Sequence, residues 1–138
     1  MTRFFLDANV VLDFLTRREP FAATSADLFQ LAEQGRVQLH VSSLSFSHVF
    51  YLLRKSVGTT AARSLLIDLS EVVAVAPVDS RAVNDALRSS FSDFEDAIQY
   101  FAAAGIPGLA AIVTRDPKGF AGGQLPVLSP DEALRLLI

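Results

Sequence analysis

The sequence contains no cysteine and only two histidines among its 138 residues. Without cysteine, neither a disulfide framework nor a thiolate zinc site can stabilise the chain, and a cytoplasmic location is expected. No apolar run approaches the roughly 20 residues that a membrane-spanning helix requires. Charged residues interrupt the first 19 positions, so we expect neither a secretory leader nor membrane association.

The chain also lacks a surplus of basic residues, since its 12 basic and 15 acidic side chains give a net charge of −3. This balance excludes a broadly basic nucleic-acid-binding surface. It leaves open a nucleic-acid enzyme whose acids surround a metal ion and whose arginines lie at the rim. Hydrophobic residues make up 51% of the chain, and this apolar surplus favours a partner surface or a homodimer.

Short apolar segments of strand length alternate with amphipathic segments of helical length along the chain. The expected strands are residues 3–6, 37–41, 72–75, 110–113 and 126–128. The expected helices are residues 13–17, 21–34, 45–55, 59–69, 79–89, 93–104 and a last helix that begins after Ser129. This alternation predicts one α/β domain over residues 1–138, with a central parallel sheet of four to five short strands and helices on both faces.

Individual residues refine this expectation. Asp79 and Asp93 are expected to cap the helices that follow them, and Asp13 to cap the short helix 13–17. Ser129 with Glu132 forms the pattern of a capping box. Seven phenylalanines are assigned to the core rather than to base stacking: Phe4, Phe5, Phe29, Phe46, Phe50, Phe94 and Phe101.

Carboxylates occupy the positions where a parallel sheet of this kind binds ligands. Asp7 directly follows the first strand and Asp116 follows the fourth, and the carboxyl ends of parallel strands open onto one crevice. Asp96 lies in the first turn of the helix that precedes the fourth strand. Acids brought together in this way repel one another unless a cation lies between them. Oxygen ligands suit Mg²⁺ or Mn²⁺, either of which can activate water for attack on a phosphodiester.

The order of these blocks resembles the PIN-domain family, in particular the VapC-type toxin ribonucleases of toxin–antitoxin pairs. The matching segments are residues 6–13, 43–45, 49–55, 93–97, 102–104 and 112–116. The resemblance implies an endoribonuclease that depends on Mg²⁺ or Mn²⁺, an RNA substrate and an antitoxin partner. It implies Asp7, Asp96 and Asp116 as metal ligands, with Asn9 and Thr114 in supporting positions.

The sequence departs from the family pattern at two positions. His48 stands where the family usually carries a glutamate on the helix after the second strand. A neutral imidazole can still bind a metal ion, so His48 is a further candidate ligand, but it adds no negative charge. Loss of this acid weakens metal binding, favours Mn²⁺, or leaves a PIN fold that binds RNA or protein without cutting. Gly119 stands where related sequences often carry aspartate, which makes Asp116 the better candidate for the last ligand.

Other interpretations stay open beside this one. Asp116-Pro117 is also an ordinary turn start, and Asp93 serves the helix cap first and the metal site second. Arg115 and Lys118 flank the proposed site and are the best candidates for phosphate contacts. A phosphatase with an aspartate nucleophile ranks last, because Asn9 occupies the place where its general acid is needed.

Overall fold

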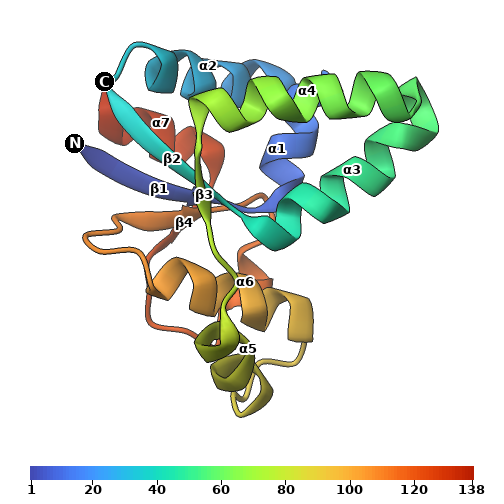
Figure 1. The fold of residues 1–138 in the computed structure, drawn as a ribbon. Coiled ribbons are helices and arrows are strands. Elements are labelled where there is room, and N and C mark those ends of the chain that lie inside the picture. The colour runs from blue at the N-terminus through green and yellow to red at the C-terminus, as the bar shows by residue number, and fades with distance from the viewer.

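Five parallel strands form the centre of the computed structural model, which describes residues 1–138 (Figure 1). They are β1 (Thr2–Leu6), β2 (Val37–Ser42), β3 (Ala74–Ala76), β4 (Ala111–Val113) and β5 (Val127–Leu128). Their order across the sheet is β3-β2-β1-β4-β5, so β1 lies in the middle. The predicted α/β architecture with a parallel sheet is therefore confirmed.

Seven α-helices and one 3₁₀ helix connect the strands. They are α1 (Ala8–Leu15), α2 (Ala22–Glu33), α3 (Ser43–Val57), α4 (Thr59–Val72), α5 (Ser80–Leu87), α6 (Phe94–Ala104), η1 (Pro117–Phe120) and α7 (Pro130–Leu137). Gly58, with φ of 85°, separates α3 from α4, a backbone conformation that glycine adopts without steric cost. None of the helices is both long and apolar enough to cross a membrane.

Both faces of the sheet are covered, as the continuous apolar run of β1 predicts. Side chains alternate along a strand, so Phe4 and Leu6 point to one face and Phe5 to the other. Phe4 and Leu6 join the larger core, with residues from α1, α2, α3, α4 and α7. Phe5 joins a smaller core with α6 and η1. Figure 1 shows these two layers, with α5 and α6 on the opposite side of the sheet from α2 and α4.

The prediction of a short helix capped by Asp13 is wrong. Helix α1 begins at Ala8, directly after β1, because the Asp7 carboxylate accepts the backbone N–H of Ala8 at 2.8 Å and caps the helix. Asp13 lies inside α1 and is fully buried. A buried carboxylate needs a partner, and Arg115 provides it through two hydrogen bonds.

Two further expectations need correction. The third strand begins at Ala74 rather than Val72, because the amphipathic pattern of α4 continues to Val72 and keeps that residue helical. Phe94 is 46% exposed and does not belong to the core. It is the first residue of α6, directly after the cap residue Asp93, and no other element covers its side chain at this end of the helix. The caps at Asp79 and Asp93 and the capping box at Ser129 are confirmed.

Candidate metal-binding site

The site begins with Asp7, which ends the central strand and starts α1. Its backbone N–H still pairs with Val113 of β4, so the residue is fixed to the sheet on one side. One carboxylate oxygen, Oδ1, caps α1 through Ala8. The second, Oδ2, accepts the Thr114 hydroxyl at 2.8 Å and the Asn9 amide at 3.4 Å. Asp7 is therefore held in one orientation at the carboxyl edge of the sheet.

Thr114 and Asn9 connect Asp7 to the segment that carries Asp116. The Thr114 side chain is fully buried, and its hydroxyl oxygen accepts the backbone N–H of Asp116 at 3.0 Å. The Asn9 amide also donates to the Thr114 hydroxyl at 3.3 Å. Its carbonyl oxygen accepts the backbone N–H of Arg115 at 3.4 Å. These bonds link the end of β1 to the end of β4.

Asp96 reaches the same region from the start of α6. Asp93 caps this helix by accepting the backbone N–H of Asp96 at 2.9 Å, so Asp93 has the structural role predicted for it. The N-terminal end of a helix carries partial positive charge, which favours acids in its first turn. Glu95 and Asp96 both occupy that turn.

A single polar pocket of about 300 Å³ brings these side chains together. It is lined by Asp7, Asn9, Leu12, His48, Glu95, Asp96, Gln99 and Asp116. The three predicted acids therefore come to one place from three distant parts of the chain. His48 projects from α3, and its Nδ1 lies 3.8 Å from a carboxylate oxygen of Glu95.

The pKa values show that the acids interact. Burial raises the pKa of Asp7, hydrogen bonds from Thr114 and Ala8 partly offset the rise, and the Asp116 carboxylate adds to it. Burial also raises the pKa of Asp96 to about 6, with contributions from four carboxylates that include Asp7 and Asp116. The Asp116 carboxylate thus makes ionisation of Asp7 and Asp96 less favourable, an effect that a cation between these acids would reverse.

The donor atoms of this pocket are of the type that a hard divalent cation binds, although they are not spaced as a complete coordination shell. No three histidine, aspartate or glutamate side chains are close enough together to hold a metal ion as they stand. Mg²⁺ usually retains several waters and needs only one or two direct carboxylate ligands. A roomy pocket lined by carboxylate and amide oxygens meets that requirement better than it meets the compact tetrahedral shell of zinc.

Arg115 and Lys118 lie outside this pocket. The Arg115 guanidinium binds Asp13 and lies 4.0 Å from the centre of the Phe21 ring. It lines a different hollow of about 360 Å³, together with residues such as Thr24 and Asp131. Lys118 is exposed on η1. Arg115 is therefore committed to a structural ion pair, and Lys118 is the freer of the two for contact with phosphate.

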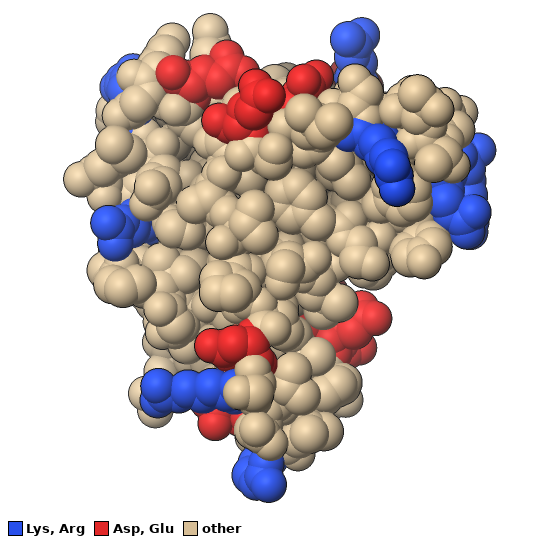
Figure 2. Space-filling model, viewed as in Figure 1, with Lys and Arg blue, Asp and Glu red and all other residues tan.

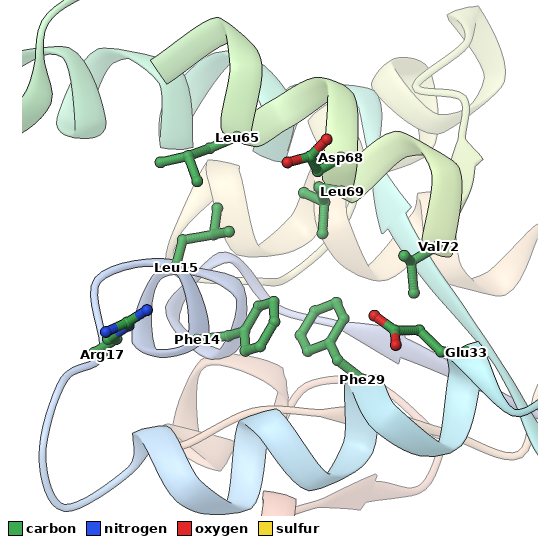
Figure 3. Close-up of a pocket in the computed structure, with 9 residues that line it drawn as sticks. All are labelled: Phe14, Leu15, Arg17, Phe29, Glu33, Leu65, Asp68, Leu69 and Val72. Carbon is green, nitrogen blue, oxygen red and sulfur yellow. The ribbon is translucent and has the colours of Figure 1, made fainter. Parts of the chain in front are cut away.

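A separate apolar pocket of about 280 Å³ lies between α1, α2 and α4 (Figure 3). Its walls are mostly aromatic and aliphatic, including Phe14, Phe29 and Leu69, and Figure 3 shows Glu33 and Asp68 beside them. It contains none of the acids predicted from the sequence, so it is distinct from the candidate metal site.

The sequence patterns did not indicate three residues that line the pocket, Leu12, Glu95 and Gln99, nor the role of Asp13 near it. Gln99 lines the pocket from α6, and its signal was its position one helical turn after Asp96. Asp13 neutralises Arg115 beneath the loop that carries Asp116, and no local pattern distinguishes it from a helix cap.

Comparison with known proteins identifies a family whose model matches most of this chain. A family model described as PIN domain matches residues 3–118. Ribonuclease VapC1 of Aquifex aeolicus (strain VF5) is 25% identical over 135 residues, which cover 94% of this chain and 92% of the relative.

Solved structures show the same fold at lower identity. The sarcin-ricin loop cleaving toxin VapC20 of Mycobacterium tuberculosis has a TM-score of 0.67 at 19% identity, covering 88% of this chain and 96% of the other. A DNA-bound VapBC of Salmonella typhimurium has a TM-score of 0.67 at 16% identity, covering 94% and 99%.

Proposed function

Because the chain belongs to the PIN domain family, we propose that it is an endoribonuclease that uses Mg²⁺ or Mn²⁺ to hydrolyse RNA phosphodiester bonds. The observation that carries the proposal is the shared pocket of Asp7, Asp96 and Asp116, which reach it from three separate elements. The raised pKa values of Asp7 and Asp96 support it, because acids that repel one another gain most from a bound cation.

In this proposal Asp7, Asp96 and Asp116 hold the cation, and the other residues position them. When bound, the cation supplies a water of lowered pKa and stabilises negative charge on the phosphate oxygens. Thr114 and Asn9 fix the Asp7 carboxylate, and Thr114 also holds the backbone at Asp116. The Asp7 carboxylate is therefore already oriented before a substrate binds.

RNA is the proposed substrate, in line with the ribonuclease VapC1 to which the chain is similar. Lys118 lies on η1, and the Cβ of a residue placed at Gly119 would touch Asp96, so η1 lies beside the pocket. Its ammonium group is suited to a phosphate contact near the cleaved bond. Arg115 contributes to such a contact less directly, because its guanidinium is bound to Asp13.

A protein partner is also proposed. VapBC assemblies are among the solved structures with the same fold, and we propose that this chain is likewise the toxin of a toxin–antitoxin pair. A homodimer is the further proposal, because α3 and α4 expose Tyr51, Leu52, Val57 and Ile67 to solvent. Figure 2 shows basic side chains over the far end of the α3–α4 hairpin, where Arg54 and Lys55 lie in the last turn of α3.

The second candidate function is a PIN-fold module that binds RNA or a protein without cutting. The observation that favours it is His48, which lines the pocket from α3 but supplies no negative charge. The acid beside it is Glu95, at 3.8 Å, and the two side chains are 46% and 67% exposed. The pocket then holds a cation less tightly than one with a carboxylate in place of His48.

A cleavage assay with matched variants separates these functions. We expect the protein to cut structured RNA with Mg²⁺ or Mn²⁺ and to stop when a chelator is added. Asp7→Asn and Asp96→Asn should each lower the rate by 100-fold or more, in the range of about 10²–10³ seen when one transition-state-stabilising group is removed. Asparagine preserves the shape of each side chain, so circular dichroism should stay unchanged.

The control is Asp27→Asn, which removes an exposed acid on α2 and should leave the cleavage rate unchanged. Activity that persists in chelator would refute the metal dependence, and activity that is equal in all three variants would refute the proposed active site. Retained RNA or protein binding without any metal-dependent cleavage would favour the binding module instead.

A further inference from the structure

The acid-lined pocket has one polar wall that the proposed metal ligands do not explain. Gln99 lies on α6, three residues after Asp96, and residues at this spacing share one face of a helix. Only 5% of Gln99 is exposed, yet it lines the same pocket as Asp7 and Asp116. A nearly buried amide in a polar pocket needs partners for both of its ends.

The amide nitrogen of Gln99 has its partner. Nε2 donates to the Ser45 hydroxyl at 2.8 Å, and the Ser42 hydroxyl donates to the same oxygen at 3.2 Å. Ser42 in turn caps α3 by accepting the backbone N–H of Ser45 at 3.0 Å. The start of α3 therefore holds the nitrogen end of Gln99 in place.

The carbonyl oxygen of Gln99 has no partner. Oε1 is buried and accepts no hydrogen bond from any group of the protein. A buried acceptor left unpaired is unfavourable. The penalty disappears when a small movement of the side chain brings Oε1 to a water held by a cation in the pocket.

We propose that Gln99 belongs to the cation site: its Oε1 accepts a hydrogen bond from the water shell of the bound ion. The inference rests on the proposed cation site of Asp7, Asp96 and Asp116. Gln99 then supplies from α6 a neutral oxygen that compensates in part for His48, which gives no carboxylate from α3. The helix that carries Asp96 thus contributes to the site at two successive turns.

Binding of Mn²⁺ alone to the full-length chain tests this inference without any measurement of cleavage. Electron paramagnetic resonance of free Mn²⁺ gives the affinity of the wild type and of four variants. Gln99→Met removes the carbonyl without adding charge, and we expect Mn²⁺ binding about tenfold weaker, as for lost outer-shell partners of other metal sites. Gln30→Met is the matched control on the exposed face of α2 and should bind as the wild type does.

Ser45→Ala separates positioning of the cation from a merely structural role. It removes the partner of Nε2 but leaves Oε1 in the protein, so its Mn²⁺ affinity should fall less than that of Gln99→Met. Equal losses in the two variants would mean that Gln99 only supports α3, and would overturn the inference. The unfolding temperature of each metal-free variant shows whether the variant is folded.

The Asp96→Asn variant distinguishes the inference from the function on which it rests. Mn²⁺ binding that is lost in Asp96→Asn but unchanged in Gln99→Met would overturn the role of Gln99 alone. Absence of Mn²⁺ binding in the wild type would overturn the cation site and the role of Gln99 together. Loss in both variants, with Gln30→Met unaffected, supports both.

Discussion

Gly119 shows how closely a single residue constrains the candidate site. A Cβ atom at this position would lie 2.5 Å from the Asp96 carboxylate oxygen Oδ2 and 3.0 Å from its Cγ. Such a contact is impossible without movement, and the end of the Asp96 side chain is the part that moves most easily. A side chain at Gly119 therefore displaces a proposed ligand rather than the backbone.

We predict that Gly119→Ala weakens Mn²⁺ binding about tenfold, the size of effect that follows from disturbing the support of a metal ligand. Thermal unfolding without metal should change little, because the displaced carboxylate is partly exposed. Gly122→Ala is the control, since its Cβ would make an ordinary contact with Phe91 at 3.7 Å. Equal Mn²⁺ affinities for the two variants would show that Asp96 is not a ligand.

The raised pKa of Asp96 gives a second prediction for a single residue. Its pKa rises from 3.8 to about 6 on folding, so the folded state holds this proton more tightly than the unfolded state. Its contribution to stability is fully present below pH 3.8 and is lost as the pH rises through about 6. The metal-free wild type should therefore lose stability over this range, and Asp96→Asn should lose less, because only the raised pKa of Asp7 still contributes.

Urea unfolding in chelator at pH 4 and at pH 7.5 measures this difference. At pH 7.5 we expect Asp96→Asn to be more stable than the wild type by about 1 kcal/mol, a value reduced for the solvent screening of a partly exposed carboxylate. At pH 4 the two proteins should differ much less. A variant that is less stable than the wild type at pH 7.5 would mean that neither burial nor the neighbouring acids disfavour the ionised form of Asp96.

The sequence allowed most of these residues to be placed, but not their contacts. Asp7, Asp96 and Asp116 were predicted because each lies next to a strand or helix end that a parallel sheet brings to one edge. Gly119 was noted only as a missing acid, and Gln99 was not considered. Their roles depend on which side chain faces which across the pocket, and no linear pattern contains that information.

At the scale of secondary structure elements, the Asp13–Arg115 pair connects α1 to the segment between β4 and η1. Asp13 is fully buried, whereas the Arg115 side chain is 23% exposed. Two hydrogen bonds join the pair, at 2.5 and 3.2 Å, and Asn9 on the same helix accepts the Arg115 backbone N–H. Helix α1 therefore holds both the backbone and the side chain of Arg115, the residue directly after Thr114.

We predict that Arg115→Met destabilises the protein by about 3 kcal/mol or more, because it leaves Asp13 buried without a counter-charge. The double variant Asp13→Leu with Arg115→Met should recover much of this loss, since an apolar pair avoids the unpaired charge. Arg81→Ala serves as the control, because its exposed pair with Asp85 on α5 contributes only about 0.5 kcal/mol. Urea unfolding measures all three.

A loss below about 1 kcal/mol in Arg115→Met would contradict this account, because removal of the partner of a buried carboxylate is strongly destabilising.

Asp13 also shows where the prediction of a helix start from the sequence was wrong. Helix α1 was expected to begin at Asp13, since an acid before an apolar pattern is typical of a cap. The cap is instead Asp7, six residues earlier, and only the distant Arg115 makes a buried Asp13 acceptable.

For the whole molecule, the order of strands and helices could be predicted because each strand is a short apolar run and each helix an amphipathic segment. The continuous apolar run of β1 indicated a strand covered on both faces, and the two cores on either side of it confirm this. The strand order β3-β2-β1-β4-β5 then brings the ends of β1 and β4 side by side. The topology therefore explains why the acids meet in one pocket, whereas the size of that pocket depends on side-chain packing.

Cation binding at this pocket should stabilise the entire fold, because a ligand that binds only the folded state shifts the unfolding equilibrium. With Mn²⁺ at about ten times its dissociation constant, the gain in the free energy of unfolding is about 1.4 kcal/mol, which for a domain of this size raises Tm by about 4 °C.

Proton release accompanies metal binding, so this rise in Tm must depend on pH. At pH 5, below the pKa of about 6 for Asp96, protons compete with the cation and the rise should be smaller than at pH 7.5. Differential scanning fluorimetry at both pH values, with Asp27→Asn as the control that keeps the full shift and Asp7→Asn as the variant that loses it, measures this linkage. An equal rise at both pH values, or in both variants, would place the cation elsewhere on the protein.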